Sequence, residues 1–598
     1  MNVTKIAEFY GIQQQRDGTM LNNGSARDAV NMETGDGNLA VSEAFHVLVS
    51  PPPRTGEGTE EWRALFAFER ATTQDILIAC SNKRIMYCLT EGYSDETFTW
   101  TELLTFDATT GCPSAEESAF DAQLARIWND DCILIATGGT RIIKVFIDQI
   151  FTPQLGKPLW TLFGSGVYYG NPFEIAAVNT GDDDDIANAV ITIGGSRGLN
   201  DDERMRAIVY GVYIMAQEGD EYTVKYLLYP DIIEGISDDG RDITLDLTGC
   251  NVSTENVIGL RGGTSNKKVS SLELFKNRLW SAGDPENTSR LYWSCAAGEG
   301  RTVEDWISDD YYEDASGGHV DVGSADGDRI VALKAMSDCI LIFKVNSVWR
   351  LYGDRPSSYT LERISDEVGA YDDKEVVTKR GIPYWLTRNG MYYSDGSGCA
   401  HVDQEVDYLK DLFWEVNGMI RRSAVSVPAI RKMLFNVYSD DIGSFILTRD
   451  DVTGSYLTFN GAQFTDLATA SDEALFLTSD GAVLHRAEDS EQLLSYAGEP
   501  LEARWESQIM ELNTLATKAQ AKALYFRASG GRIHIRIQTD IGSVEQEVVP
   551  SDMQTNVVRI PVNMAESRYM RIFISNVQGS RFEIQGGICI LYDRIFEG

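Results

Sequence analysis

The residues that most often carry chemistry are scattered through this sequence. Its five histidines are His46, His319, His401, His485 and His534. None belongs to an H-E-x-x-H motif or another close pair, the spacing that places two imidazoles on one zinc ion. We therefore expect no catalytic zinc site, no other metal site and no cofactor.

One stretch matches a catalytic motif. Gly194–Gly198 reads G-G-S-R-G, which fits G-x-S-x-G, and it follows the apolar run ANAVITIGG. A nucleophile elbow needs a strand, a sharp turn and then a helix within an α/β sheet. The flanking sequence is instead typical of an all-β region, and no residue stands out as a triad partner. We interpret Ser196 as part of a Gly-rich loop that ends a strand.

Acidic residues raise two further possibilities. The run Asp182–Asp185 could attract Ca²⁺, but it lacks the spaced D-x-[DN]-x-[DN]-G pattern, so a solvated acidic loop is favoured. Glycosidases need two carboxylates across the scissile bond, and no pair among the 90 acidic residues stands out by spacing. TSDGAVLH and YSDGSGC resemble the Asp-box of sialidases without its closing Thr-Trp, and hairpin turns explain them. We expect no catalytic residue and no enzyme activity.

The cysteines also indicate a packing role rather than a chemical one. They are Cys80, Cys88, Cys112, Cys132, Cys250, Cys295, Cys339, Cys399 and Cys589, with no C-x-x-C among them. Most lie in apolar runs, where a free thiol packs as a small hydrophobic group, and this usage fits a reducing compartment. The N-terminus lacks the pattern of a signal peptide, and no run of about 18 apolar residues exists. We expect folding in cytoplasm without membrane insertion.

The charge balance narrows the possible partners. The 598 residues include 52 basic and 90 acidic side chains, a net charge of −38. Such a chain is poorly suited to binding nucleic acid by neutralising phosphates. An acidic surface would instead let DNA slide past without sticking, although the acid could simply keep a large protein soluble.

The elements that would position these residues are short strands. Seven segments read as strand, tight polar turn and strand, and the phrase DCILI opens two of them, at Asp131 and Asp338. Asn389-Gly390 and Asp480-Gly481 supply hairpin turns that need positive φ. The segments are DILIACSNKRIMYCL, DCILIATGGTRIIKVF, NRLWSAGDPENTSRLYWS, DCILIFKVNSVWRLYG, IPYWLTRNGMYYSDG, KMLFNVYSDDIGSFILTRD and EALFLTSDGAVLHRA. Their starts lie roughly 40–60 residues apart outside one gap, which is typical of β-propeller blades.

These patterns predict an all-β chain: a β-propeller of six or seven blades with two added β domains. The propeller would occupy 54–160 and 265–495, and an inserted β-sandwich-like domain 161–264. A C-terminal β-sandwich would occupy 496–598, where GRIHIRIQTD alternates strictly. Residues 1–53 would form an N-terminal arm or supply a strand that closes the propeller. Helical periodicity is scarce, and Val406–Ile420 is its best example.

The middle of the chain resembles a known family. LFKNRLWSAG, RLYWS, EDW, GGHVDVGSADGDRIVAL, CILIFKVNSVWRLYG, ISDEVGAYDDKEVV and YWLTRNGMYYSDG follow one another from Leu274 onward. This succession resembles the β-propeller tail nozzle or hub proteins of double-stranded DNA bacteriophages, also called packaged-DNA stabilisation proteins. The similarity covers residues 60–490 and is strongest over 271–396. The family pattern contains no catalytic residue, so none is transferred.

The resemblance implies a virion protein of the phage tail that is assembled in host cytoplasm. Its copies would form a homo-oligomeric ring, often a hexamer, around the DNA exit channel and contact other tail, portal or adaptor proteins. An acidic lumen would let double-stranded DNA pass during ejection without phosphate contacts.

Two alternatives remain open. The chain could be a receptor-binding or glycan-binding tail protein, possibly glycan-cleaving, with aromatic and carboxylate groups at a blade mouth. It could also be a cellular scaffold propeller that binds other proteins as a monomer.

Overall fold

A computed structural model shows the chain as two compact units. The first comprises Met1–Glu117, Val345–Val348 and Ile364–Gly598, and the second comprises Ser118–Lys344 and Trp349–Arg363. The structure describes residues 2–595 except 14–22, 54–58, 70–73, 91–96, 107–119, 128–129, 156–157, 164–167, 181–187, 219–220, 229–231, 262–267, 298–302, 305, 307–315, 325, 388–389, 403–420, 440–442, 488–491, 512–517, 551–556 and 563–565. Three features named from the sequence therefore lie outside the described residues: Asp182–Asp185, Cys112 and the whole helical window Val406–Ile420.

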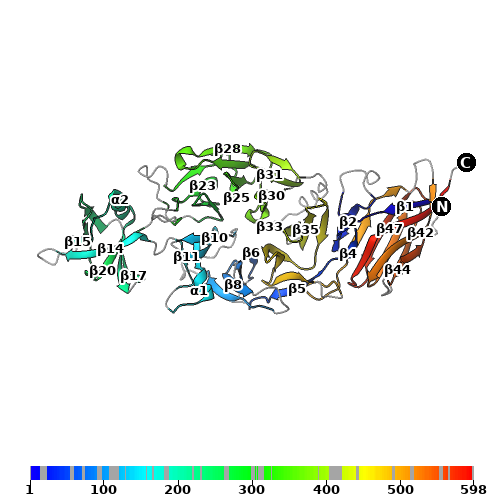
Figure 1. The fold of residues 1–598 in the computed structure, drawn as a ribbon, viewed down its shortest axis with the longest axis horizontal. Coiled ribbons are helices and arrows are strands. Elements are labelled where there is room, and N and C mark those ends of the chain that lie inside the picture. The colour runs from blue at the N-terminus through cyan, green and yellow to red at the C-terminus, as the bar shows by residue number, and fades with distance from the viewer. Residues whose placement is uncertain are drawn as a thin grey trace. The chain divides into compact units, whose positions relative to one another are not determined.

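The predicted fold class is confirmed: the chain is all-β and most of its sheets are small propeller-type sheets of four antiparallel strands (Figure 1). In the first unit these are β6–β9 (Trp62–Phe68, Asp75–Ser81, Arg84–Thr90, Thr101–Thr105), β29–β32 (Val377–Lys379, Ile382–Thr387, Gly390–Ser394, Cys399–His401) and β37–β39 (Phe464–Ala470, Glu473–Thr478, Val483–Ala487) with β5 (Ala44–Val49). In the second unit they are β10–β13 (Asp121–Ile127, Asp130–Ala136, Ile143–Phe146, Trp160–Leu162), β21–β24 (Ser271–Phe275, Arg278–Ala282, Arg290–Trp293, Gly318–Asp321) and β25–β28 (Ile330–Ala335, Cys339–Lys344, Val348–Tyr352, Thr360–Ser365).

Four more consecutive strands, β33–β36, belong to a larger sheet of ten strands in the first unit. The prediction of six or seven blades stays a prediction. The bounds of these strands are Arg421–Val427, Lys432–Ser439, Gly443–Asp450 and Tyr456–Phe459.

All seven segments identified in the sequence occupy the same place in their sheets. Each supplies the second and third of four neighbouring strands, from β7–β8 through β38–β39, and in the last case the fourth strand is β5 from the N-terminal segment. The two DCILI phrases lie in β11 and β26, and Cys132–Ala136 and Cys339–Lys344 are buried throughout. The repeat is therefore an architectural one: the same apolar phrase forms the same buried strand of two sheets.

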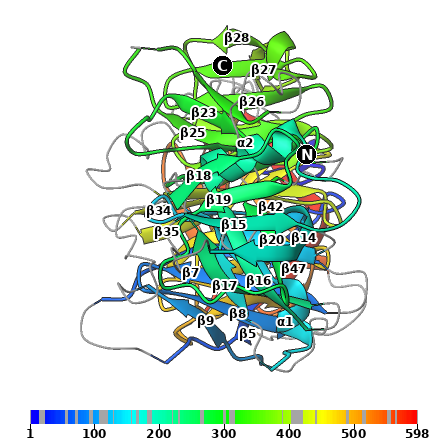
Figure 2. The same cartoon turned by 90° about the vertical axis from the view of Figure 1, so that its left-hand side faces the viewer.

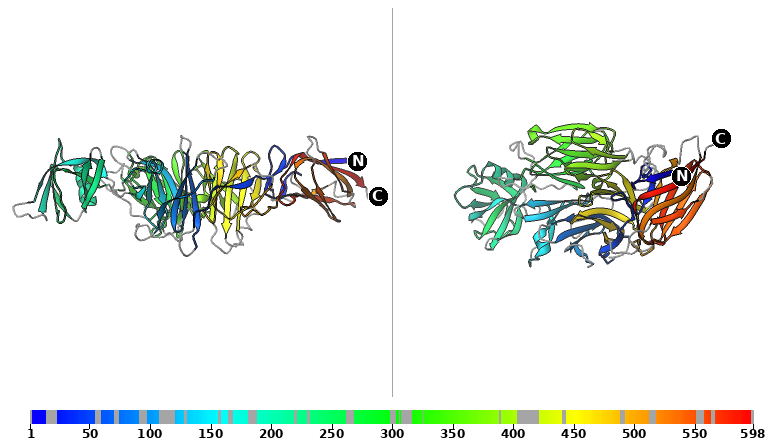
Figure 3. Two further views of the ribbon diagram at one scale, coloured as in Figure 1. Left: turned by 90° about the horizontal axis from the view of Figure 1, so that it is seen from below. Right: turned by 45° about the vertical axis from the view of Figure 1, so that its right-hand side comes forward.

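The strands of the N-terminal segment join several sheets of the first unit. β1 (Asn2–Ile6) pairs with β47 (Phe582–Ile595) along Asn2↔Tyr592 to Ile6↔Ile588, and Figure 3 shows these two terminal strands together. β2 (Ala26–Val30) pairs with β36 and with β40 (Arg504–Ser507), while β3 (Met32–Glu33) and β4 (Leu39–Val41) join the sheet of β47. β5 then becomes the fourth strand beside β39.

The inserted region folds as a β-rich domain within the second unit. Its strands follow the order β17-β16-β20-β14-β15-β19-β18, and the long β14 takes part in two sheets. Helix α2 (Asp201–Tyr210) packs on β18 and β20. Figure 2 shows α2 beside β18 on this side of the domain. The strands are β14 (Tyr168–Asn179), β15 (Ala189–Ile193), β16 (Val212–Glu218), β17 (Glu221–Leu228), β18 (Ile233–Ile236), β19 (Asp242–Leu245) and β20 (Asn256–Arg261); a short helix α1 (Ile147–Phe151) precedes them.

The C-terminal region is the predicted sandwich. One sheet has the order β3-β4-β47-β42-β45, and the other runs from β2 through β40, β46 and β43 to β44. Ile533, Ile535 and Ile537 are buried, as their alternation predicts, while Arg536 on the opposite face lies over the ring of Phe573. The remaining bounds are β41 (Met510–Glu511), β42 (Lys518–Gly530), β43 (Ile533–Thr539), β44 (Ser543–Val548), β45 (Val557–Pro561) and β46 (Tyr569–Asn576).

Over the described ranges, no helix has both the length and the apolar composition needed to span a membrane.

Candidate functional site

The histidines do not come together as a metal centre. His46 on β5 and His485 on β39 are opposite each other, with ring centroids 6.3 Å apart, and His485 Nδ1 lies 3.4 Å from Glu473. His401 packs edge-on against Tyr392. In the part of the chain that the structure describes, no group of three or more His, Cys, Asp or Glu side chains could hold a metal ion.

Ser196 lies in a local arrangement that the sequence interpretation missed. It is in the turn between β15 and α2, so a helix does follow the strand, contrary to the expectation of purely β surroundings. The helix begins with a capping box in which Asn200 and Glu203 satisfy each other's backbone N–H groups, and the N-x-x-E spacing is the signal that could have revealed it. Ser196 itself is exposed, and the inserted domain contains no histidine to act as its base.

The two Asp-box-like stretches are hairpin turns. Asp480 accepts a hydrogen bond from Thr478 Oγ1, and Tyr496 OH donates to its other oxygen at 3.0 Å. Asp395 accepts from the backbone N–H and the hydroxyl of Ser397. Because both carboxylates are engaged in turn geometry, their interpretation as turns is consistent with the structure.

The cysteines pack as expected of small hydrophobic groups. Burial raises the pKa of Cys88 to about 12 and that of Cys339 to about 11. Such thiols stay protonated at neutral pH and are poor nucleophiles. Eight cysteines are described, and all are free thiols.

Half-buried carboxylates connect neighbouring sheets through their first strands in the second unit. Asp121 on β10 accepts a hydrogen bond from the N–H of Leu272 on β21 at 2.7 Å, and its other oxygen accepts from Ala122 N–H. Glu273 on β21 accepts in turn from the N–H of Ala335 on β25. These side chains join strands of three successive four-stranded sheets, and hydrogen bonds to charged groups are each worth about 1.5–3 kcal/mol.

The first unit repeats this contact. Asp466 on β37 accepts from the N–H of Leu65 on β6 at 2.6 Å, and its other oxygen accepts from Leu467 N–H. Lys374 contacts the same carboxylate and donates to Leu65 O at 2.6 Å. Burial raises the pKa of Asp466, and Lys374 opposes that rise. These links could not be predicted from the sequence, because single acidic residues within strands look like ordinary surface positions.

Glu273 is expected to make stability depend on pH. Burial raises its pKa to about 7, Asp121 adds to the rise, and Lys334 opposes it. Since the folded pKa exceeds the unfolded value of about 4.5, this group stabilises the fold fully below pH ~4.5 and loses that contribution as pH rises to ~7. As pH rises from about 4.5 to about 7, the unfolding free energy of the wild type should therefore fall by up to about 3 kcal/mol relative to that of Glu273→Gln.

Denaturant unfolding of both proteins between pH 4 and 8 measures this difference. Glu286→Gln, at an exposed position of the same unit, is the matched control and should follow the wild type at every pH. If the difference in unfolding free energy between Glu273→Gln and the wild type stays constant with pH, the raised pKa of Glu273 is contradicted.

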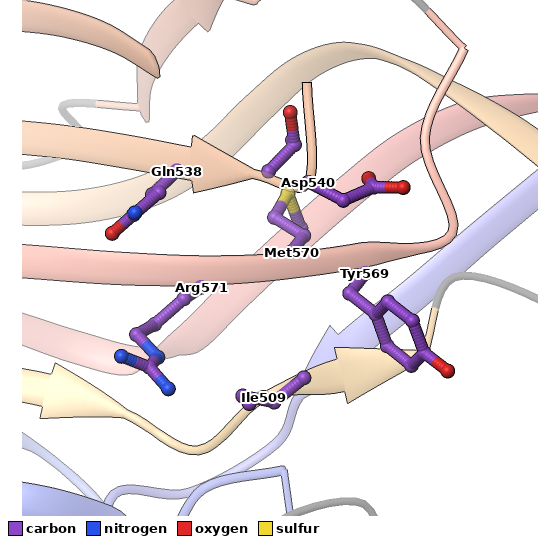
Figure 4. A pocket seen from close by; sticks show the side chains of 7 residues that line it. Ile509, Gln538, Asp540, Tyr569, Met570 and Arg571 are labelled. Carbon is purple, nitrogen blue, oxygen red and sulfur yellow. The ribbon is translucent and has the colours of Figure 1, made fainter. Parts of the chain in front are cut away.

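An open pocket of about 410 Å³ lies in the C-terminal sandwich (Figure 4). Its lining comes from the end of β43 and the turn that follows, the start of β46, and the connection between β40 and β41. The lining residues are Ile509, Gln538, Thr539, Asp540, Tyr569, Met570 and Arg571. The sequence interpretation named none of them, because residues from three separate segments meet only in the folded sandwich.

Comparison with known proteins does not assign the chain to a family. No family model matches it, and no curated protein matches it. Among solved structures it is similar to the computationally designed Ika8 protein (12% identity, 74% of this chain and 99% of the other, TM-score 0.34). It is also similar to BamB from Moraxella catarrhalis (7%, 82% and 99%, TM-score 0.31) and to a puromycin-hydrolyzing peptidase of Mycobacterium tuberculosis (10%, 74% and 57%, TM-score 0.27). Similarities this weak indicate nothing about what the chain does.

Proposed function

We propose that this chain is a structural protein of a bacteriophage tail. It would act as a nozzle, hub or connector whose copies form a ring around the DNA exit channel and join neighbouring tail components. The observation that carries the proposal is the ordered succession of segments from Leu274 onward that resembles such proteins.

The burial of that succession supports an architectural role for it. LFKNRLWSAG runs from β21 into β22, where Leu279 belongs to one hydrophobic core cluster and Trp280 and Ala282 belong to another. The segment CILIFK is β26, which is buried along its whole length. Segments buried as packing strands suit a protein whose task is rigid assembly, and we propose no catalytic role.

The proposed ring is tested by its mass. Light scattering of the purified protein should give an oligomer, six times the 66.4 kDa chain mass in the hexameric case, and negative-stain images should show rings. The parent virions should contain the protein. A strictly monomeric protein that is absent from purified virions would rule the proposal out.

The protein should not bind double-stranded DNA. Its acidic side chains outnumber the basic ones by 90 to 52, and 18 acidic against 6 basic residues lie in the inserted region 161–264 alone. Phosphates should be repelled most strongly at low salt, because screening is weakest there. A filter-binding assay at about 50 mM salt should show no retention. Tight binding that weakens steeply with added salt would argue against an acidic lumen.

A further inference from the structure

The pocket in the C-terminal sandwich lies in the least acidic part of the chain. Residues 496–598 contain 11 basic and 12 acidic side chains, whereas the inserted region has a surplus of 12 acidic ones. A negatively charged ligand is repelled by most of this protein but meets almost no net charge at the sandwich. The sandwich is therefore where an anionic small molecule could approach.

The walls of the pocket suit a ring with an apolar face. The half-buried Ile509 offers an aliphatic surface and the half-buried Tyr569 adds an aromatic ring (Figure 4), while the neighbouring Met570 is 1% exposed and belongs to the core. A pyranose presents C–H groups on one face, and these pack against aromatic and aliphatic side chains. The volume of about 410 Å³ falls within the range of small-ligand sites and would hold one or two sugar rings.

Hydroxyl groups at the edge of such a ring would meet planar polar side chains. Gln538 and Asp540 are exposed at the rim. One oxygen of Asp540 accepts the Arg568 N–H at 3.2 Å, which fixes the carboxylate in the turn after β43. An amide and a carboxylate can each form two hydrogen bonds in one plane, as neighbouring hydroxyls require.

Arg571 brings a guanidinium group to the pocket. Its Nη1 donates to Glu506 at 2.8 Å, and its side chain is 19% exposed. Arg27 approaches the same Glu506 oxygen at 4.0 Å. Burial and the nearby Arg27 both lower the pKa of Arg571, because each disfavours its positive charge. A carboxylate in the pocket would add a negative charge beside this guanidinium.

We propose that this pocket binds a carboxylate-bearing saccharide, such as a uronic acid, through Tyr569, Gln538, Asp540 and Arg571. An acidic peptide fits less well. Extended peptides bind by pairing with a free strand edge, and β46 already has β43 on one side and β40 and β41 on the other. The proposal does not depend on the ring proposed above, because it uses only the sandwich of a single chain.

Saturation-transfer NMR and calorimetry on the full chain test this site with D-glucuronic acid, D-galacturonic acid and N-acetylneuraminic acid as probes. Glucose, acetate and the peptide acetyl-Glu-Glu-amide are the comparisons. At least one acidic sugar should bind, and glucose and acetate should each bind at least tenfold more weakly. Polymeric uronan then distinguishes a polysaccharide from a free sugar as the source, since neighbouring rings would add affinity only for the polymer.

Variants locate the binding. Tyr569→Ala and Arg571→Gln should each weaken binding at least tenfold, and Gln538→Ala, at an exposed position that the fold does not need, should weaken it severalfold. Arg536→Gln, on the same face but outside the pocket, is the matched control and should bind like the wild type. Thermal unfolding checks that each variant is folded.

Three results would overturn the proposal. The first is that none of the acidic sugars binds at 10 mM, on the order of the weakest affinity worth calling a site. The second is that acetate or the peptide binds as well as the sugars. The third is that binding persists in both Tyr569→Ala and Gln538→Ala. None of these results bears on the ring, whose test is the particle mass.

Discussion

Replacing Asp466 by alanine is expected to destabilise the first unit by about 3–5 kcal/mol, one of the two largest effects that the structure predicts. Asp466 is 1% exposed and its carboxylate contacts Lys374 and the Leu65 N–H. Alanine would leave the ammonium group of Lys374 without its counter-charge and the backbone donor without its acceptor. Removing one partner of a buried pair costs far more than the pair is worth, because the remaining charge stays desolvated.

Urea unfolding followed by circular dichroism measures this loss, and Asp354→Ala is its matched control. Asp354 pairs with Lys276 at 2.7 Å, but its side chain is 84% exposed, so its removal should leave the unfolding free energy nearly unchanged. The double variant Lys374→Met/Asp466→Leu should recover part of the loss, since an apolar pair leaves no buried charge, although the Leu65 N–H still lacks its acceptor. Equal effects of Asp466→Ala and Asp354→Ala would show that the buried contact is not the source.

The repeated strands were predictable because they depend on local pattern. Apolar runs closed by Gly, Asn and Asp mark a strand and its turn wherever they occur, and all seven such segments are second and third strands. The alternation at Ile533, Ile535 and Ile537 likewise identified the buried face of β43 before any partner strand was known. Apolar residues at every second position of a strand mark its buried face, whichever strands pair with it in the fold.

Groups that act across long sequence separations could not be predicted in this way. Lys344 ends the apolar run of β26, and its ammonium group is buried against Asp326 and the Val322 carbonyl. Nothing in the run distinguishes it from a lysine at a strand end in solvent. The same holds for the pocket, where Gln538 and Arg571 meet only because β43 and β46 pair in one particular register.

Removing residues 1–50 is expected to abolish the cooperative folding of the first unit. This deletion takes away β5, whose Leu48 and Val49 are fully buried and whose backbone pairs with β39. It also removes β2, which pairs with both β36 and β40. Losing a large buried side chain typically costs about 2–5 kcal/mol, so several such losses exceed the roughly 5–15 kcal/mol that stabilise a domain.

Soluble yield and calorimetric unfolding of the shortened chain measure this effect. Deleting residues 1–5 is the matched control, because it keeps Ile6, the one buried residue of β1, and residues 2–5 are partly or fully exposed. That control should unfold close to the wild type. Residues 1–60 supplied as a separate chain during expression should restore part of the soluble yield, since the missing strands would again satisfy the edges of β36, β39 and β40. If the shortened chain unfolds cooperatively at the unfolding temperature of the wild type, the remaining sheets are stable without these strands and the prediction is wrong.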